Sequence, residues 1–225
     1  MKFVAFGRTD VGRKRVRNED NFLVNNDRGL FVVADGMGGH ANGELASSIV
    51  IETFKNIADG TLESCIKTAN STILNYPGGH GMGSTVVAMQ VTNDHVTWSH
   101  VGDSRAYMVR DGRIRQLTKD HSANSELLDA GVSPEKVKMM GVGNIITRAC
   151  GIHGKAKADT KSWVPIVGDV FLLCSDGLTN EVDDDMLLLL MTGTDDPGKI
   201  TNEMINAANA NGGRDNITAI VVKVL

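Results

Sequence analysis

Apolar residues in this chain form two kinds of pattern: short continuous runs, and stripes in which they recur every three to four positions. Residues 30–34 (LFVVA) and 170–174 (VFLLC) are continuous apolar runs, which are typical of buried strands. Residues 44–58 and 61–75 carry the stripes. The pattern therefore predicts two buried strands and two amphipathic helices.

The other predicted elements are two antiparallel strand pairs, two helices and one further strand. They cover residues 85–91 with 96–101, 105–109 with 113–117, 183–191, 197–210 and 216–224. The second pair flanks Asp111-Gly112, a strong two-residue hairpin signal. Since the helices do not alternate one-to-one with strands, the order favours an α+β fold of antiparallel sheets with helices outside over a doubly wound parallel sheet.

Composition indicates an ordinary globular protein. Its 225 residues are 41% hydrophobic and 22% charged, which is compatible with one domain spanning residues 1–225. A nucleic-acid partner would normally require a basic patch or stripe. The net charge is −4, and the longest basic cluster, at residues 13–17, runs straight into Glu19 and Asp20. We therefore expect no nucleic-acid partner.

The cysteines and the lengths of the apolar runs bear on location. Three cysteines without a CxxC pair fit a reducing compartment and argue against a disulfide framework. The first apolar stretch turns polar by Arg8, which is too short for a signal peptide. No run approaches the roughly 20 apolar residues that span a membrane. The sequence predicts a cytoplasmic protein without a membrane segment.

Acidic residues stand at the ends of several predicted strands. Asp35, Asp103 and Asp176 follow apolar strands, whereas Asp20 and Asp215 precede them. Converging carboxylates repel one another unless a cation neutralises them, and Mg²⁺ and Mn²⁺ prefer oxygen ligands. A single Asp-Gly after a strand is also an ordinary turn. Five acids placed in this way favour a site that binds a divalent cation over a set of ordinary turns.

Other chemistries lack their residues. No cysteine is followed by arginine six positions later, and there is no Gly-x-Ser-x-Gly elbow. An aspartyl-phosphate enzyme would need a second acid two positions after Asp35, where Met37 stands. The histidines show no HExxH pattern, so zinc is not expected. Residues 78–85 have the glycine spacing of a phosphate loop but lack lysine before Ser84, which makes nucleotide binding a weak hypothesis.

Seven short motifs follow one another from about residue 12 to the C-terminus. In order they are Arg15-x-x-Asn18-Glu19-Asp20, Val33-Ala34-Asp35-Gly36-Met37-Gly38-Gly39-His40, Gly83-Ser84-Thr85, Val101-Gly102-Asp103-Ser104-Arg105-Ala106, Leu117-Thr118-x-Asp120-His121-Ser122, Ser175-Asp176-Gly177-Leu178 and Asp215-Asn216-Ile217-Thr218. Together they are far more specific than one Asp-Gly. In content and order they resemble the motifs of the metal-dependent serine/threonine protein phosphatases of the PPM, or protein phosphatase 2C, family, in their compact bacterial form.

The resemblance implies a fold and a metal centre. The fold is a four-layer αββα sandwich of two antiparallel sheets flanked by helices. Two Mn²⁺ or Mg²⁺ ions would lie at one edge, and a third, weaker site would involve Asp103 together with Asp176. The implied ligands of the main pair are Asp20, Asp35, the Gly36 carbonyl, Asp176 and Asp215.

The resemblance also implies a reaction. A hydroxide bridging the two cations would attack phosphorus directly, without a phosphoenzyme. Glu19 would orient metal-bound water, and Arg15 would bind the phosphate, because a planar guanidinium can hold two oxygens. The implied substrates are phosphoserine and phosphothreonine in proteins, opposite a serine/threonine kinase. We expect a monomer.

Two departures from the family pattern limit these expectations. Some members carry histidine directly after the Asp-Gly as a candidate proton donor; here Met37 stands there, and the nearest histidine is His40, for which packing is the alternative role. Residues 119–148 would form a flap beside the site, and 123–146 match the family least. Two other functions stay open. One is a catalytically silent binding module, although such modules typically lose ligand positions that are all filled here. The other is a small-molecule phosphatase.

Overall fold

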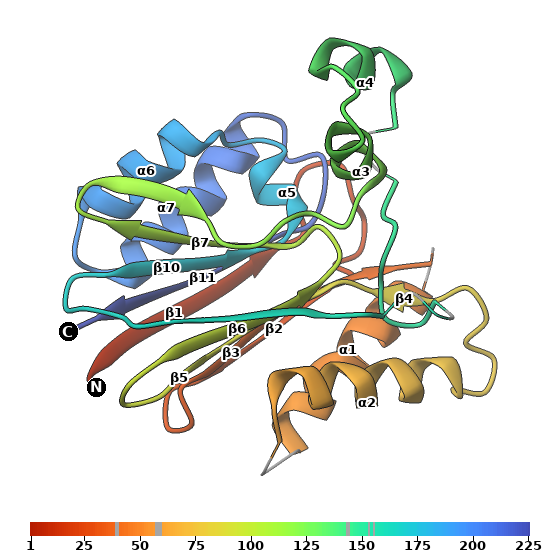
Figure 1. Cartoon of the computed structure of the whole chain (residues 1–225), viewed down its shortest axis with the longest axis horizontal. Helices are drawn as coiled ribbons and strands as arrows, with labels where there is room; N and C mark the ends of the chain where they lie inside the picture. Colours follow the sequence, from red (N-terminus) through yellow and green to blue (C-terminus); the bar gives the residue numbers. More distant parts are fainter. Residues whose placement is uncertain (39–40, 57–59, 143–144, 153, 155) are drawn as a thin grey trace.

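Two antiparallel sheets stacked face to face form the centre of the molecule (Figure 1). The structure is a computed structural model that describes residues 1–38, 41–56, 60–142, 145–152, 154 and 156–225. The first sheet has the order β1 (Phe3–Asp10), β11 (Ile217–Val224), β10 (Val170–Cys174), β7 (Arg105–Arg110) and β8 (Arg113–Gln116). The second has the order β2 (Asp20–Asn25), β3 (Leu30–Met37), β5 (Val86–Val91), β6 (Val96–Val101) and β9 (Asp159–Trp163), and β4 (Gly83–Ser84) pairs with the end of β3.

Helices cover both outer faces, which confirms the αββα sandwich. The first sheet is covered by α6 (Asp184–Gly193) and α7 (Pro197–Ala210), and the second by α1 (Ala41–Asn56) and α2 (Leu62–Leu74) (Figure 1). Three hydrophobic cores fill the three interfaces between the four layers. Within β3, Phe31 and Val33 face the other sheet, whereas Val32 faces α1 and α2. Burial on both faces explains why β3 is a continuous apolar run.

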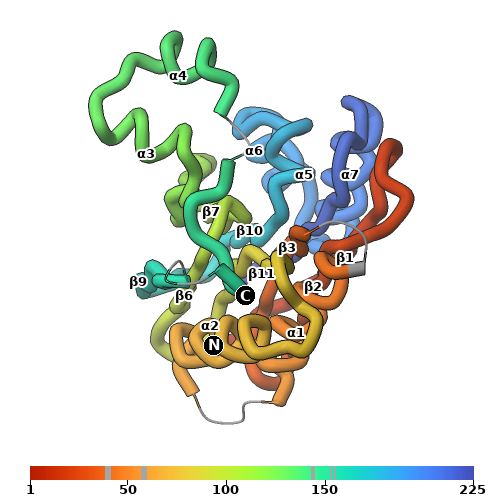
Figure 2. The backbone as a smooth tube through the Cα atoms, turned by 90° about the vertical axis from the view of Figure 1, so that its right-hand side faces the viewer, coloured from red at the N-terminus to blue at the C-terminus, as the bar shows by residue number. Residues whose placement is uncertain are grey.

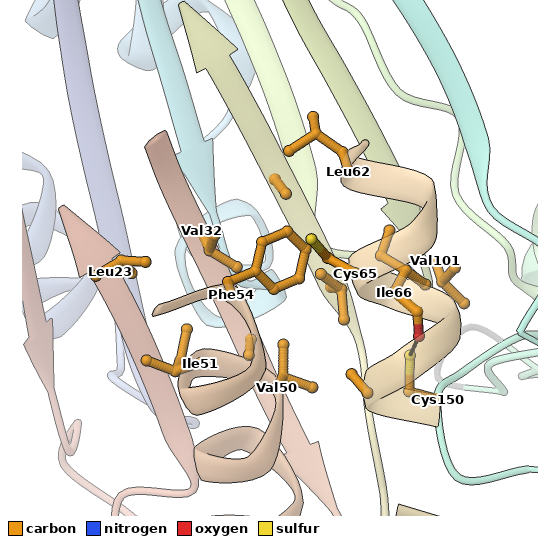
Figure 3. Close-up of a cluster of buried hydrophobic side chains, with 14 of the residues drawn as sticks. Leu23, Val32, Val50, Ile51, Phe54, Leu62, Cys65, Ile66, Val101 and Cys150 are labelled. Carbon is orange, nitrogen blue, oxygen red and sulfur yellow. Dashed lines mark hydrogen bonds between the residues drawn. The ribbon is translucent and has the colours of Figure 1, made fainter. Parts of the chain in front are cut away.

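The core beneath the second sheet shows how α1 and α2 are held (Figure 3). Phe54 of α1 and Ile66 of α2 are fully buried against strand residues such as Val32. Burying side chains of this size contributes about 1.5–3 kcal/mol each relative to leaving them in water. The Cys150 thiol packs in the same layer, with its Sγ 3.9 Å from the Ile66 carbonyl oxygen. This layer fixes α1, whose first turn adjoins the candidate site.

After β8 the chain carries two short helices, α3 (Ala123–Asp129) and α4 (Pro134–Met140), which project beyond the sheets (Figures 1 and 2). Ser122 caps α3 by accepting a hydrogen bond from the Ser125 amide, and α4 ends at Gly141 in the left-handed conformation. In α3, which is described throughout, every residue retains solvent contact.

The structure corrects the predicted positions of some elements. The Asp111-Gly112 hairpin is present, with φ of 51° and 69°, and joins β7 to β8. However, β3 continues to Met37, so Asp35 lies within a strand rather than after it. The sequence analysis did not predict the short helix α5 (Asp176–Thr179) or the strands β1 and β9. The two strands lie at sheet edges, where their side chains are half-buried or exposed and leave no clear pattern.

Among the described residues, the helices are all too short or too polar to cross a membrane.

Candidate metal centre

Strand register places two of the predicted acids opposite each other. In the antiparallel pair β2–β3, Asp20 is the direct partner of Asp35. Directly opposed residues project from the same face, with Cβ atoms about 4.5–5.5 Å apart. The next residue of β3, Gly36, pairs with Ser84 of β4, and the Thr85 amide donates to the Asp35 carbonyl over 2.9 Å. The backbone that carries the acids is therefore held on both sides.

The first sheet brings two more acids to the same edge. Asp176 follows β10 as the first residue of α5, and Asp215 precedes the antiparallel neighbour β11. The Ser175 amide donates to the Thr218 carbonyl over 3.1 Å, which joins these two segments. Asn180 Nδ2 donates to Asp176 Oδ2 over 3.0 Å, so the Asp176 side chain is also held by its own helix. Viewed onto this edge, the ends of the two sheets lie beside α5 (Figure 2).

Arg15 is carried by a loop fastened to the segment before β11. The Arg13 amide donates to the Gly213 carbonyl over 2.7 Å, and Asn216 Nδ2 donates to the carbonyls of Val11 and Arg17. At the tip of this loop, Arg15 Nη2 lies 2.7 Å from Asp215 Oδ2. The Arg15 side chain is 57% exposed, which leaves most of its fork open to a ligand. Its pKa is raised, chiefly by the hydrogen bond to Asp215.

Glu19 and Gly36 lie where β2, β3 and α1 meet. The Glu19 amide donates to Asn216 Oδ1 over 2.8 Å, and the Gly36 amide donates to the Glu19 carbonyl over 3.2 Å. A side chain at Gly43 of α1 would collide with the Glu19 carboxylate, and one at Gly36 would collide with the Gly43 backbone. Glycine at both positions lets the first turn of α1 approach the strand and leaves room for the Glu19 carboxylate.

The electrostatics of the buried acids are unfavourable as long as no cation is bound. Burial and then the charges of its neighbours, Asp20 first, raise the pKa of Asp35 well above its usual range. Burial raises the pKa of Asp20 to about 7 and, together with Asp176, that of Asp103 to about 7. The pKa of Asp176 is raised by burial and by Asp215. A set of acids that destabilise one another's charged forms is typical of a functional site.

The oxygen donors fit a hard divalent cation. Asp20 Oδ1 and Asp103 Oδ1 are buried and have no hydrogen-bond partner among the described residues. Such atoms are costly unless something binds them. In the described part of the chain, no group of three or more His, Cys, Asp or Glu side chains is already gathered as a complete metal site. Carboxylates without a cation repel one another, and Asp215 is paired with Arg15, so the acids lie apart until a cation binds between them.

Two adjoining clefts open at this edge. The larger, of about 870 Å³, is lined by Arg15, Glu19, Asp35, Gly36, Asp176 and Asp215 among others. The smaller, of about 550 Å³, contains Asp103. Asp176 and Asn180 line both clefts, and therefore connect the main set of acids to Asp103. Asp20 is buried behind the larger cleft.

The identity of a proton donor stays a prediction. Met37 lines the larger cleft, as does Ile146 from the end of the 119–148 segment. His40 lies outside the described residues, so its predicted alternatives stay predictions. The structure also reveals supporting residues to which the sequence analysis gave no role. Asn18, Ser175, Asn216 and Thr218 stood in the quoted motifs, and their position beside the acids was the available signal. Thr9, on the unpredicted strand β1, had none.

Comparison with known proteins shows which family this chain is similar to. The family model described as Protein phosphatase 2C matches residues 11–220. A serine/threonine phosphatase of Listeria monocytogenes is 36% identical over 96% of this chain and 94% of its own length. The serine/threonine phosphatase structure of S. agalactiae superposes with a TM-score of 0.91 at 31% identity, covering 100% of both chains.

A third similar protein was solved with metal. The structure of the catalytic domain of the serine/threonine protein phosphatase PstP in complex with two manganese ions has a TM-score of 0.86 at 33% identity, covering 99% of this chain and 98% of that one. The family model and these similarities extend over nearly the whole sequence, including the segments that supply all five acids. The chain belongs to the protein phosphatase 2C family of metal-dependent phosphatases.

Proposed function

We propose that this protein hydrolyses phosphoserine and phosphothreonine monoesters in proteins, using two Mn²⁺ or Mg²⁺ ions. The observation that carries the proposal is the meeting of acids from separate segments at one cleft that also contains Arg15. The serine/threonine phosphatases to which the chain is similar support the substrate class.

In this proposal the chain's own residues have separate tasks. Asp20, Asp35, the Gly36 carbonyl, Asp176 and Asp215 hold the cation pair. When bound, the two ions lower the pKa of a shared water and neutralise charge on the phosphoryl group. The Arg15 fork binds two phosphate oxygens, which requires Arg15 to turn its free nitrogens into the cleft while Asp215 holds the other side. Glu19, whose carboxylate has room beside Gly43, orients water.

A third, weaker cation site would use Asp103 together with Asp176. Its support is that Asp176 lines both clefts and that Asp103 Oδ1 is buried without a partner among the described residues. The cleft at Asp103 also contains Arg105, but Arg105 already donates to Asp120 through two nitrogens. The orphaned Asp103 oxygen therefore remains available to a cation.

The broader organisation follows from the same geometry. Acids near residues 20 and 215 meet at one cleft, which supports a single catalytic domain over residues 1–225 acting as a monomer. Residues 119–148 would act as a flap, because Ile146 and Leu128 line the two clefts. A serine/threonine kinase would supply the phosphorylated substrates. The three buried, free cysteines are consistent with the cytoplasm.

The direct test is Mn²⁺-dependent turnover of a phosphothreonine peptide by the purified chain. We expect turnover that EDTA abolishes, and no turnover by Asp176→Asn at the same melting temperature. Faster turnover of a sugar phosphate would favour a small-molecule phosphatase. Folded wild-type protein that binds Mn²⁺ without turning over any phosphomonoester would instead indicate a silent binding module, and activity that survives EDTA would refute the metal-based proposal.

A further inference from the structure

Asp20 stands at the end of a continuous chain of side-chain hydrogen bonds. Asn18 Nδ2 donates to Thr9 Oγ1 over 2.8 Å, and Thr9 Oγ1 lies 2.7 Å from Thr218 Oγ1. Thr218 Oγ1 donates to Asp20 Oδ2 over 2.6 Å. Ser175 Oγ donates to the same oxygen over 2.7 Å. Two hydroxyl groups therefore converge on one oxygen of a buried carboxylate.

When Asp20 is ionised, as a metal ligand must be, the bond between the two threonines has only one possible direction. A hydroxyl group carries a single proton, and an ionised carboxylate can only accept. Because Thr218 gives its proton to Asp20, Thr9 must donate to Thr218, and Thr9 can in turn accept from Asn18. The Asp20 amide donates to Asn18 Oδ1 over 3.2 Å, which closes the chain into a ring. The ring is therefore consistent only with acceptance at Asp20 Oδ2.

The ring joins the two sheets at the edge that contains the acids. Thr9 and Thr218 are direct partners across β1 and β11 of the first sheet, whereas Asp20 begins β2 of the second. Both hydroxyl donors use Oδ2, and Oδ1 is the oxygen left without a partner among the described residues. Neither threonine lines the larger or the smaller cleft, so neither is placed to touch a substrate.

We propose that Thr9 and Thr218 are positioning residues that, through their hydroxyl groups and with Ser175 and Asn18, fix the Asp20 carboxylate so that Oδ1 is presented to the cation pair. This inference rests on the proposed function. Outer hydrogen bonds of this kind orient metal ligands in other sites, and their loss costs about 10–100-fold in metal affinity. Thr9 is the informative member, because it lies two hydrogen bonds away from the carboxylate and on a separate strand.

The competing explanation is that the threonines only pack the two sheets together. Two substitutions at one position separate the explanations. Thr9→Val keeps the shape and removes the hydroxyl, whereas Thr9→Ser keeps the hydroxyl and removes the methyl group. A positioning role predicts that serine preserves metal affinity and valine does not. A packing role predicts instead that valine preserves both the metal affinity and the melting temperature, and that serine lowers the melting temperature.

The experiment is calorimetric titration of the full chain with MnCl₂ after removal of metal, with the melting temperature of each metal-free variant measured alongside. We expect Mn²⁺ to bind about three- to tenfold more weakly to Thr9→Val, and tenfold or more weakly to Thr218→Val. Thr9→Ser should bind within about twofold of wild type. The matched control is Thr160→Val, which removes a similar hydroxyl bond, 2.8 Å long to Ser99, between β6 and β9; its Mn²⁺ affinity should not change.

The outcomes separate this inference from the proposed function. Wild-type protein that binds no Mn²⁺ would overturn both. If wild type binds and Thr9→Val binds equally well, or if Thr9→Ser binds as weakly as Thr9→Val, the positioning role of Thr9 is wrong while the proposed function stands. Should Thr9→Val fail to fold, Asn18→Ala breaks the ring at its first donor without altering a strand. We expect it to weaken Mn²⁺ binding about threefold, and an unchanged affinity would overturn the inference.

Discussion

The two ends of β10 carry aspartates in opposite electrostatic surroundings. Asp169, just before the strand, is only 1% exposed and receives two hydrogen bonds from Arg110, of 2.7 and 2.5 Å, and one from the Ile166 amide. Asp176, just after the strand, is half-buried, and its pKa is raised by burial and by the charge of Asp215. Asp169 therefore has its counter-ion within the chain, whereas no Arg, Lys or His of the described residues forms an ion pair with Asp176.

The difference shows which acids serve the fold. A buried charge must be paired, because leaving it unpaired costs several kcal/mol. At Asp169 the pairing side chain is built into the chain, whereas at the other end the exposed Arg15–Asp215 contact is the one ion pair that the described residues form with the five acids. We infer that Asp169 stabilises the fold, and that the acids at the opposite end of β10 are available to bind cations.

The largest effect is expected from Asp35→Asn. Because Asp35 is one of the proposed ligands of the cation pair, kcat/KM should fall at least about a thousandfold, equivalent to several kcal/mol of transition-state stabilisation. Steady-state kinetics with p-nitrophenyl phosphate and Mn²⁺ measure this loss. The metal-free variant should melt no lower than wild type, since the amide removes one repelling charge. Near wild-type turnover would contradict the assignment.

Asp169→Asn should give the converse result. Removing one partner of a buried ion pair should lower the free energy of unfolding by about 3 kcal/mol, which urea denaturation measures. Turnover per folded molecule should stay within about twofold of wild type, because Asp169 lies at the far end of β10. A loss of activity without a loss of stability would mean that the two ends do not divide their roles in this way.

Arg15→Ala tests the role of the exposed arginine at the acidic end. A charge-assisted hydrogen bond to substrate contributes about 1.5–3 kcal/mol, so kcat/KM should fall about tenfold or more. The Arg15–Asp215 pair is exposed, and exposed pairs contribute at most about 1 kcal/mol to stability. Kinetics and thermal melting together measure both quantities. Arg15→Lys is the control, because it keeps the charge and loses the fork, and it should recover only part of the activity.

The metal-free chain should lose stability as the pH rises. The pKa values of Asp20 and Asp103 are about 7, whereas the ordinary value is 3.8, so the folded state binds more protons than the unfolded state between these values. Stability is therefore greatest at low pH within this window and falls up to about pH 7. A loss of about 2 kcal/mol would lower Tm by about 4–8 °C. Melting in EDTA measures it, and saturating Mn²⁺ should remove the slope.

The smallest effect is expected from Asp103→Asn. If Asp103 contributes to a third, weaker site, turnover should fall less than about tenfold, and the loss should shrink as the Mn²⁺ concentration rises. The measurement is turnover over a Mn²⁺ concentration series. A loss as large as that of Asp35→Asn, independent of Mn²⁺, would place Asp103 in the main centre instead.

Much of the fold could be predicted from the sequence, because burial leaves a periodic pattern. Strands such as β3 and β10 are apolar on both faces, and helix α2 buries one regular stripe. The strands β1 and β9 escaped prediction because they lie at sheet edges, where half-exposed positions carry no clear alternation. The Asp169–Arg110 pair could not be predicted, since its members lie 59 residues apart without a shared motif.

The acids of the site were easier to predict than the residues that hold them in place. The aspartates stand in recognisable motifs, and the structure places them around two connected clefts. Their supports depend on strand register, which a single sequence does not reveal: Thr9 meets Thr218 only because β1 pairs with β11 in one alignment. The bond from Arg15 to Asp215 likewise depends on how the loop after β1 is fastened to Gly213.

The pairing of β11 between β1 and β10 has a consequence for biosynthesis. Asp215 and Thr218 belong to the segment that leaves the ribosome after every other part of the cleft, and β11 is also the strand that joins β1 to the rest of its sheet. A nascent chain that has not yet released this segment lacks both an acid and a donor to Asp20. A chain that ends before this segment therefore lacks one acid of the cleft and one hydroxyl donor to Asp20, and we expect it to bind no cation pair.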